Sequence, residues 1–160
     1  MIAKVKGRFD EVAGTVTGDL ADPASLQLDV TLQTASIDTH QAQRDQHLRS
    51  ADFFNAERWP TIRFVGKRLV GDPSSEFRIV GDLTIRDVTR EVVLDVVNEG
   101  TASDPWGGFR AGYSVKGKID RRDFGLTWNQ ALEAGGFVVG DEIKLSADVE
   151  LTAVAEAAAA

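Results

Sequence analysis

Period-two alternation of apolar and polar residues constrains the fold of this chain more than any other sequence feature. Between residues 143 and 151 every odd position is aliphatic or alanine, and every even position is polar. Successive side chains of a strand point to opposite faces, so this pattern predicts a strand with one face in a core and one in water. The same alternation recurs in six further segments, which lie at residues 8–20, 26–33, 61–69, 77–86, 92–97 and 109–119.

Turn-forming residues separate these segments and favour a curled antiparallel sheet. They lie at residues 71–74, 87–89 and 100–108. Seven such strands with short connections predict an all-β chain, either a sandwich or a barrel. Glycines at inward positions favour a barrel, because they allow sharp bends and leave interior volume unfilled. These glycines are Gly14, Gly18, Gly81 and Gly117.

Residues 41–50 form the one helical segment that the pattern predicts. Asp38 and Thr39 can cap its N-terminus, Gln41 is placed as a capping-box partner, and Asp45 and Arg49 are an i,i+4 pair. No repeat or linker divides the rest of the sequence. We therefore expect a single domain over residues 1–154, followed by a frayed Ala-rich tail at 155–160.

Composition excludes several classes of function. The 18 Lys and Arg against 25 Asp and Glu give a net charge of −7, which argues against nucleic-acid binding and against docking on anionic membranes. Cysteine is absent, so disulfides and thiolate metal sites are excluded. No apolar run is long enough to span a bilayer, and residues 1–7 lack a signal core. We expect the chain as given to be cytoplasmic, or periplasmic or secreted if its natural start lies upstream.

A search for catalytic or metal-binding residues yields no convincing set. His40 and His47 have no third ligand at a suitable spacing, and nucleophile-elbow and phosphate-loop motifs are absent. Most carboxylates fall at polar strand positions. The cluster of residues 120–123 is interpreted as a surface ion-pair network in preference to a ligand contact. The sequence therefore predicts a protein that is not an enzyme and that uses no metal and no cofactor.

Aromatic residues gather near the predicted strand ends. Such residues line the mouth of a pocket or plug the ends of a dry barrel, and the pattern alone does not separate these alternatives. They lie in three groups: Phe53, Phe54, Trp59 and Phe64; Trp106 and Phe109; and Phe124, Trp128 and Phe137.

Several motifs resemble the YceI-like polyisoprenoid-binding proteins. Residues 44–55, Arg-Asp-Gln-His-Leu-Arg-Ser-Ala-Asp-Phe-Phe-Asn, are followed at 59–64 by Trp-Pro-Thr-Ile-Arg-Phe, and together they are similar to the family signature. Further agreement, in family order, lies at residues 7–16, 81–90, 119–125 and 139–145, so the resemblance spans residues 4–152.

The resemblance implies an extended antiparallel barrel, lipocalin-like or streptavidin-like, whose apolar bore holds a polyprenyl phosphate or another single-chain amphiphile. Its candidate lining residues are Phe9, Leu32, Phe53, Phe54, Phe64, Ile79, Leu83, Leu94, Phe109, Tyr113, Phe124 and Leu145. Candidate head-group contacts at the mouth are Arg44, Asn55, Arg121 and Asn129.

These features favour non-enzymatic carriage or sequestration of a long apolar lipid. The alternative is a structural or interaction module with a packed core that works through its surface or an open edge. An enzyme acting on a lipid head group would need acid–base residues inside the bore, and the alternation places most carboxylates outside.

Two departures from the family pattern lead to further expectations. Family members begin with an additional strand before the stretch that matches Met1, so we expect a barrel open at one edge, able to pair with another copy as a homodimer. Asp87 stands where family members often have glycine in a two-residue turn. Asp tolerates left-handed backbone, so we expect the turn to persist.

Overall fold

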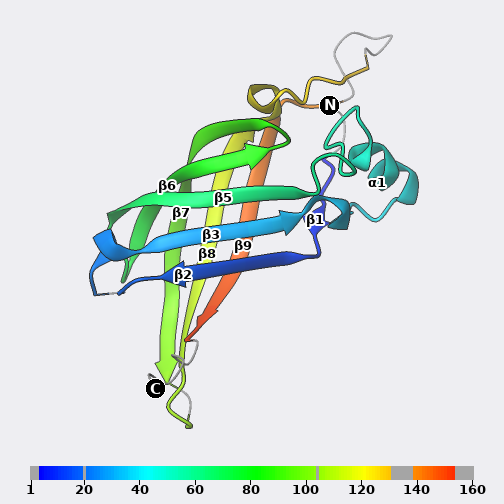
Figure 1. Ribbon diagram of the computed structural model, residues 1–160. Coiled ribbons are helices and arrows are strands. Elements are labelled where there is room, and N and C mark those ends of the chain that lie inside the picture. Colours follow the sequence, from blue (N-terminus) through cyan, green and yellow to red (C-terminus); the bar gives the residue numbers. More distant parts are fainter. Residues whose placement is uncertain (1–3, 20, 104, 131–138, 154–160) are drawn as a thin grey trace, which may run out of the picture.

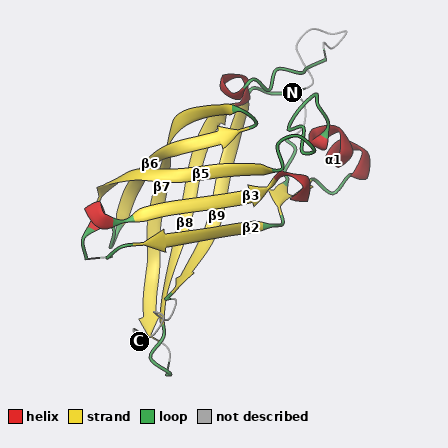
Figure 2. Cartoon of the chain, in the orientation of Figure 1, coloured by secondary structure: helices red, strands yellow, loops and turns green. Residues whose placement is uncertain are grey.

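The structure is a computed structural model, and it describes residues 4–19, 21–103, 105–130 and 139–153. Antiparallel strands dominate this part of the chain, with one short α-helix, so the predicted all-β class is confirmed (Figure 2). Phe137 and the Ala-rich tail lie outside the described residues. The elements are β1 (Arg8–Phe9), β2 (Val12–Thr17), η1 (Pro23–Ser25), β3 (Gln27–Gln33), η2 (Thr34–Ser36), β4 (Ile37–Asp38), α1 (Ala42–Arg49), β5 (Thr61–Gly71), β6 (Glu76–Ile85), β7 (Val88–Ser103), β8 (Phe109–Asp120), η3 (Arg121–Phe124) and β9 (Glu142–Thr152).

The main sheet has seven strands in the order β2-β3-β5-β6-β7-β8-β9, and every neighbouring pair is antiparallel. Strands β2, β3 and β5 run across the view in Figure 1, whereas β8 and β9 run steeply down it, so the sheet curls strongly. Its outer strands are β2 and β9, which pair in the described chain only with β3 and β8. The fold is therefore a half-barrel with two open edges.

Two irregularities in strand pairing accompany the curl. The register shifts between Gly66 and Arg68 in β5, and again between Asn98 and Gly100 in β7. An extra residue in one strand bends it and increases its local twist. Both long strands of the sheet centre are therefore bent, which turns the β2 side toward the β9 side.

The turn between β6 and β7 keeps its two residues but differs from expectation. The left-handed residue is Arg86, with φ of 58°, and not Asp87. The Arg86 guanidinium donates to the Phe53 carbonyl at 3.3 Å and lies 5.1 Å from the centre of the Trp59 ring. A left-handed backbone is less strained for glycine than for arginine, and these contacts of the Arg86 side chain stabilise it in that conformation. They also connect the hairpin to the chain after α1.

The predicted helix is confirmed as Ala42–Arg49, but its predicted capping is wrong. Gln41 is the N-cap residue and makes no side-chain cap bond. The backbone N–H of Thr39 donates to the Asp45 carboxylate at 2.8 Å, and its hydroxyl donates to the same oxygen. Arg49 donates to the Ala35 carbonyl at 2.9 Å. Asp45 and Arg49 therefore anchor the helix to the preceding chain.

Candidate ligand-binding face

One face of the curled sheet is mainly apolar, and its polar residues come from β7, where Arg90 lies opposite Leu83 and Asn98 opposite Tyr113. Residues paired directly across neighbouring strands share a face. The pairs Val30↔Phe64, Ile79↔Leu94 and Val115↔Ala147 are apolar on both sides and lie on β3/β5, β6/β7 and β8/β9. Residues from β3, β6, β7 and β8 on this face pack against one buried cluster, so it is the inside of the curl. We call it the concave face.

The opposite, convex face carries cross-strand ion pairs. Arg63 on β5 contacts Asp29 on β3 at 2.6 Å, and this hydrogen-bonded guanidinium lowers the pKa of the Asp29 carboxyl. Lys67 bridges Asp82 at 2.9 Å and Glu91 at 3.3 Å. A charged outer face and an apolar inner face fix which side of the sheet faces water.

The inward glycines do not leave empty volume, so that expectation is wrong. A Cβ on Gly81 would lie 2.5 Å from Cζ of Phe64, whose ring covers the glycine. A Cβ on Gly117 would lie 2.6 Å from Cδ2 of Leu94. The glycines instead let large neighbouring side chains lie flat on the sheet.

One end of the concave face is closed by the chain that follows β8. Phe124 and Leu126 are 2% and 5% exposed. They pack in one buried cluster with Ile62, Phe64, Leu83 and Ile85. We call this region the closed end.

Arg121 holds the chain at the closed end in place. Its side chain is buried and donates to the carbonyls of Leu126 at 2.6 Å, Trp128 at 2.8 Å and Gly140 at 2.9 Å. The guanidinium also lies 3.6 Å from the Asp141 carboxylate. These acceptors satisfy a buried cation and join the end of β8 to the chain entering β9.

An aromatic cluster connects α1 to the same chain. The rings of His47, Phe53 and Trp128 lie with centroids 4.5–5.3 Å apart, mostly edge to face. His47 also contacts Asp52, with 2.9 Å between Nε2 and Oδ2. Phe53 and Trp128 therefore pack on each other at this end of the sheet, as in the plug, which is one of the two alternatives that the sequence left open.

The concave face is open along both edges of the described sheet. Val12 on β2 is 57% exposed, and Ile143 and Val149 on β9 are 37% and 38% exposed. Tyr113 on β8 contacts Phe77 on β6 edge to face, with ring centroids 6.0 Å apart. The apolar surface thus forms an open trough. It is not the enclosed bore that the sequence led us to expect.

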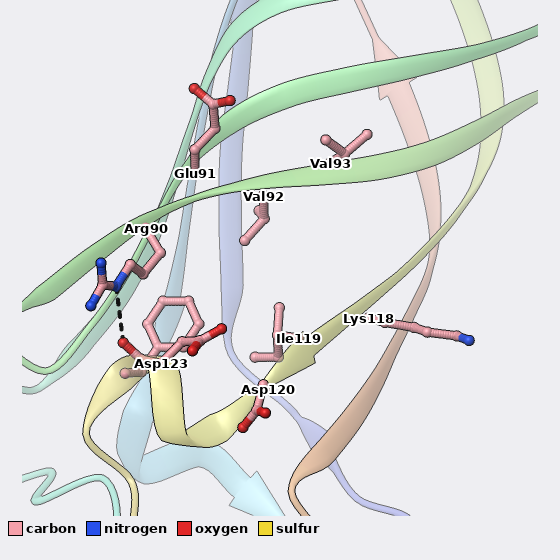
Figure 3. Close-up of a pocket in the computed structure, with 9 residues that line it drawn as sticks. Arg90, Glu91, Val92, Val93, Lys118, Ile119, Asp120 and Asp123 are labelled. Atoms are coloured by element: carbon pink, nitrogen blue, oxygen red, sulfur yellow. Dashed lines mark hydrogen bonds between the residues drawn. The ribbon is translucent and has the colours of Figure 1, made fainter.

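A cleft of about 290 Å³ lies where β7 and β8 separate above η3 (Figure 3). The two strands are paired from Asp95↔Lys116 to Ser103↔Phe109. In the part of β7 before Asp95 they are not paired, and the side chains of Val92 and Ile119 lie between them. Arg90 lies at one side of the cleft and donates through Nε to the Asp123 carbonyl at 3.1 Å. A second cleft of about 370 Å³ adjoins it, beside Asp120 and Asp141. Charged residues of both signs line the two clefts, which suits neither an apolar tail nor a simple anion.

The described residues show no group of three or more His, Asp or Glu side chains that could hold a metal. His40 is exposed and His47 belongs to the aromatic cluster. No helix in the described ranges is long and apolar enough to cross a membrane.

Comparison with known proteins identifies the family. A family model described as the YceI-like domain matches residues 1–151. The chain belongs to this family. A UPF0312 protein of Staphylococcus aureus strain MSSA476 is 39% identical over 153 residues, which cover 95% of this chain and 86% of that protein. A UPF0312 protein of strain N315 is 38% identical over the same coverage.

Solved structures of YceI-like proteins have the same fold. The Campylobacter jejuni YCEI protein matches with a TM-score of 0.82 and 31% identity, covering 97% of this chain and 88% of that one. The Burkholderia cenocepacia protein BcnA matches with a TM-score of 0.76 at 18% identity, covering 94% and 90%, and shows likeness of fold alone.

The lining residues implied by the YceI-like resemblance divide into two regions. Phe64, Leu83 and Phe124 are buried at the closed end, and Phe9, Leu32, Phe54, Ile79 and Leu94 pack against them, while Phe53 lies in the aromatic cluster. Phe109, Tyr113 and Leu145 are half-buried on β8 and β9. The first group fills the closed end, and the second faces the open trough.

The four candidate head-group residues make contacts within the chain. Arg44 donates to the Thr39 hydroxyl and carbonyl, both at 2.7 Å. Asn55 has φ of 48° and turns the chain after α1. Asn129 bonds both backbone groups of Val139, and Arg121 binds carbonyls as described above. Arg121 and Asn129 both donate to the Val139 carbonyl, whereas no hydrogen bond in the described part of the chain joins them to Arg44 or Asn55, and contact of all four with a ligand stays a prediction.

Several core residues were missing from the sequence-based set. Ile62 and Ile85 obey the same alternation as their predicted neighbours and could have been found from it. Leu126 follows no strand pattern, and its carbonyl accepts from Arg121, a buried side chain that also bonds the Val139 and Gly140 carbonyls 18 and 19 residues away. No local signal in the sequence marks such a residue.

Proposed function

We propose that this protein binds a single-chain amphiphile with a long apolar tail, of the polyisoprenoid class, along its concave face and leaves it chemically unchanged. The observation that carries the proposal is that every two neighbouring strands from β2 to β9 place at least one apolar pair on this face, including Val96↔Val115 between β7 and β8. The family resemblance to polyisoprenoid-binding proteins supports the same ligand class.

The free energy available from such burial is large enough for binding. An apolar tail gains about 0.8 kcal/mol for each CH₂ group removed from water. Three or four isoprene units, with five carbons each, would therefore gain about 12–16 kcal/mol if fully buried, before the costs of association and ordering. Because the trough is open at its edges, part of the tail stays in water and the net gain is smaller. Tail length and width then determine selectivity more than hydrogen bonding does.

A role in carriage or sequestration follows from the placement of charge. The concave face is lined mainly by aliphatic and aromatic residues, whereas Asp29, Asp82 and Glu91 form ion pairs on the convex face. General acid–base chemistry needs a titratable group within hydrogen-bond reach of the substrate. A tail on the concave face lies on the far side of the sheet from these carboxylates.

Native mass spectrometry tests the proposal directly. Protein purified from cells under mild conditions is expected to carry a bound amphiphile. After delipidation it should bind geranylgeraniol at micromolar concentration. Delipidated, folded protein that binds neither geranylgeraniol nor palmitic acid at that level contradicts the proposal.

A matched pair of variants on β9 identifies the face involved. Ala147 faces the trough and Ser146 faces the other side of the same strand, and both are exposed. Ala147→Glu places a charge against the tail and is expected to weaken geranylgeraniol binding by about tenfold or more. Ser146→Glu makes a comparable change on the opposite face and should leave affinity within about twofold.

A second candidate function uses the open edge at β9. Ile143 and Val149 are exposed beside unpaired backbone groups, which is typical of a strand that pairs with another chain. Antiparallel pairing of two β9 strands centred on Ala147 would set Leu145 against Val149 and Lys144 against Glu150. Light scattering tests this homodimer. Val149→Lys is expected to dissociate it, and a wild-type monomer at high micromolar concentration rules it out.

A further inference from the structure

The connection between β7 and β8 exposes a tryptophan almost completely. Trp106 is 90% exposed, the largest value among the exposed large hydrophobic residues. It lies in the tip between Ser103 and Phe109, which projects from the lower end of the molecule in Figure 1, far from α1. We call residues 100–109 the β7–β8 tip.

The composition of the β7–β8 tip suits a neutral lipid surface. Its sequence, Gly-Thr-Ala-Ser-Asp-Pro-Trp-Gly-Gly-Phe, contains one ionisable residue, Asp104, and no cation. The flanking Arg110 is paired with Glu150 at 2.7 Å. An indole prefers the boundary between head groups and acyl chains, where its ring is apolar and its N–H meets polar groups. Anionic lipids attract polybasic segments, which this tip lacks.

The tip continues into the concave face along β8. Phe109, Ala111 and Tyr113 alternate on one side of that strand. Leu151 lies opposite Ala111 and Val149 opposite Tyr113, and both come from the open edge strand β9. An apolar row therefore runs along β8 and β9 from Phe109, the last residue of the tip, into the trough.

We propose that the β7–β8 tip docks on a zwitterionic lipid surface by inserting Trp106, and that the amphiphile passes from that surface along β8 into the concave face. This inference rests on the proposed function for its transfer step. The docking step stands on the exposure of Trp106 and the chemistry of the tip.

Phosphatidylcholine vesicles with brominated acyl chains test the docking step. Bromine quenches an indole that reaches the acyl chains, so wild-type fluorescence is expected to fall on binding. Trp106→Ala should weaken vesicle binding about fivefold or more and remove most of the quenching. Val70→Ala is the matched control. Val70 is also exposed, near the end of β5, and this variant should bind vesicles as the wild type does.

Three results would overturn docking through Trp106. The first is equal vesicle binding by wild type and Trp106→Ala, and the second is quenching that persists in that variant. The third is wild-type self-association without vesicles that Trp106→Ala abolishes, which would assign the tip to a contact between copies. Binding that requires phosphatidylglycerol would overturn the zwitterionic preference.

Transfer is measured separately, so that its failure is distinguishable from failure of the proposed function. Trp106→Ala is expected to bind geranylgeraniol in solution within about twofold of wild type, but to extract it from vesicles about fivefold more slowly. Equal extraction rates overturn the transfer step. If the protein docks on vesicles but does not bind geranylgeraniol in solution, the proposed function and the transfer step are both contradicted. That result would support the docking step alone.

Discussion

Arg121 and Arg122 are adjacent in sequence but have opposite environments. Arg121 is 3% exposed and its guanidinium is surrounded by backbone carbonyls at the closed end. Arg122 is exposed and pairs with Asp120 at 2.7 Å. The interpretation of residues 120–123 as a surface ion-pair network holds for Arg122, whereas Arg121 has a buried structural role.

Replacing Arg121 should therefore cost far more stability than replacing Arg122. Arg121→Met leaves several buried carbonyls without a donor and is expected to lower the free energy of unfolding by about 3 kcal/mol. Arg122→Met removes an exposed pair and should cost less than about 1 kcal/mol. Urea denaturation measures both, and equal losses would contradict the role assigned to Arg121.

Gly81 gives a second prediction at the residue scale. A Cβ there would approach Cζ of Phe64 at 2.5 Å and the Val65 carbonyl oxygen at 2.6 Å. Gly81→Ala should force the Phe64 ring from the closed end and destabilise the fold by about 2 kcal/mol. Gly112 has no heavy atom closer than 3.9 Å to an added Cβ, so Gly112→Ala is the control. It should be neutral or slightly stabilising in thermal unfolding.

At the scale of elements, the N-terminus of η3 is capped by the ionised side chain of Asp120. The Arg122 side chain and backbone N–H both donate to the Asp120 carboxylate, which lowers its pKa from 3.8 to about 2. The unfolded chain therefore takes up this proton first as the solution is acidified. The stabilising contribution is complete above pH 3.8 and is lost as the pH falls through about 2.

Asp120→Asn should remove this part of the acid sensitivity. The drop in the free energy of unfolding between neutral pH and pH about 2 is expected to be smaller in the variant than in the wild type. Arg122→Gln should raise the pKa of Asp120 toward 3.8, observed by NMR titration of its carboxyl carbon. An unchanged pKa in Arg122→Gln would show that Arg122 is not the cause.

Sequence patterns predicted the strands well and their ends less well. Alternation identified β3, β5, β6, β8 and β9. Successive residues of these strands face the core and the solvent in turn, so apolar and polar residues alternate in the sequence. The capping of α1 and the left-handed position in the β6–β7 turn were predicted wrongly. Both depend on contacts outside the local segment, through Thr39 with Asp45 and through Arg86 with Phe53.

At the scale of the whole molecule, alternation predicted which face is apolar but not what lies against it. Residues such as Leu83 and Leu145 have the same pattern, yet the first is buried at the closed end and the second lines the open trough. The difference arises from the chain after β8, which covers one region of the concave face and leaves the other open. Curl and coverage are set by long-range packing, which no single strand encodes.

The concave face extends from β2 to β9, so a tail bound along it would contact strands from both sides of the half-barrel. We therefore expect the ligand to stabilise the whole fold. A ligand that binds the folded state alone adds about 2.7 kcal/mol at a concentration one hundred times its Kd. Geranylgeraniol at that excess should therefore raise the urea midpoint of delipidated protein. Ser146→Glu should show the full increase. Ala147→Glu, weakened about tenfold by the glutamate charge against the tail, should show at most about half of it at the same ligand concentration. Equal increases in the two variants would place the ligand away from the β9 side of the concave face.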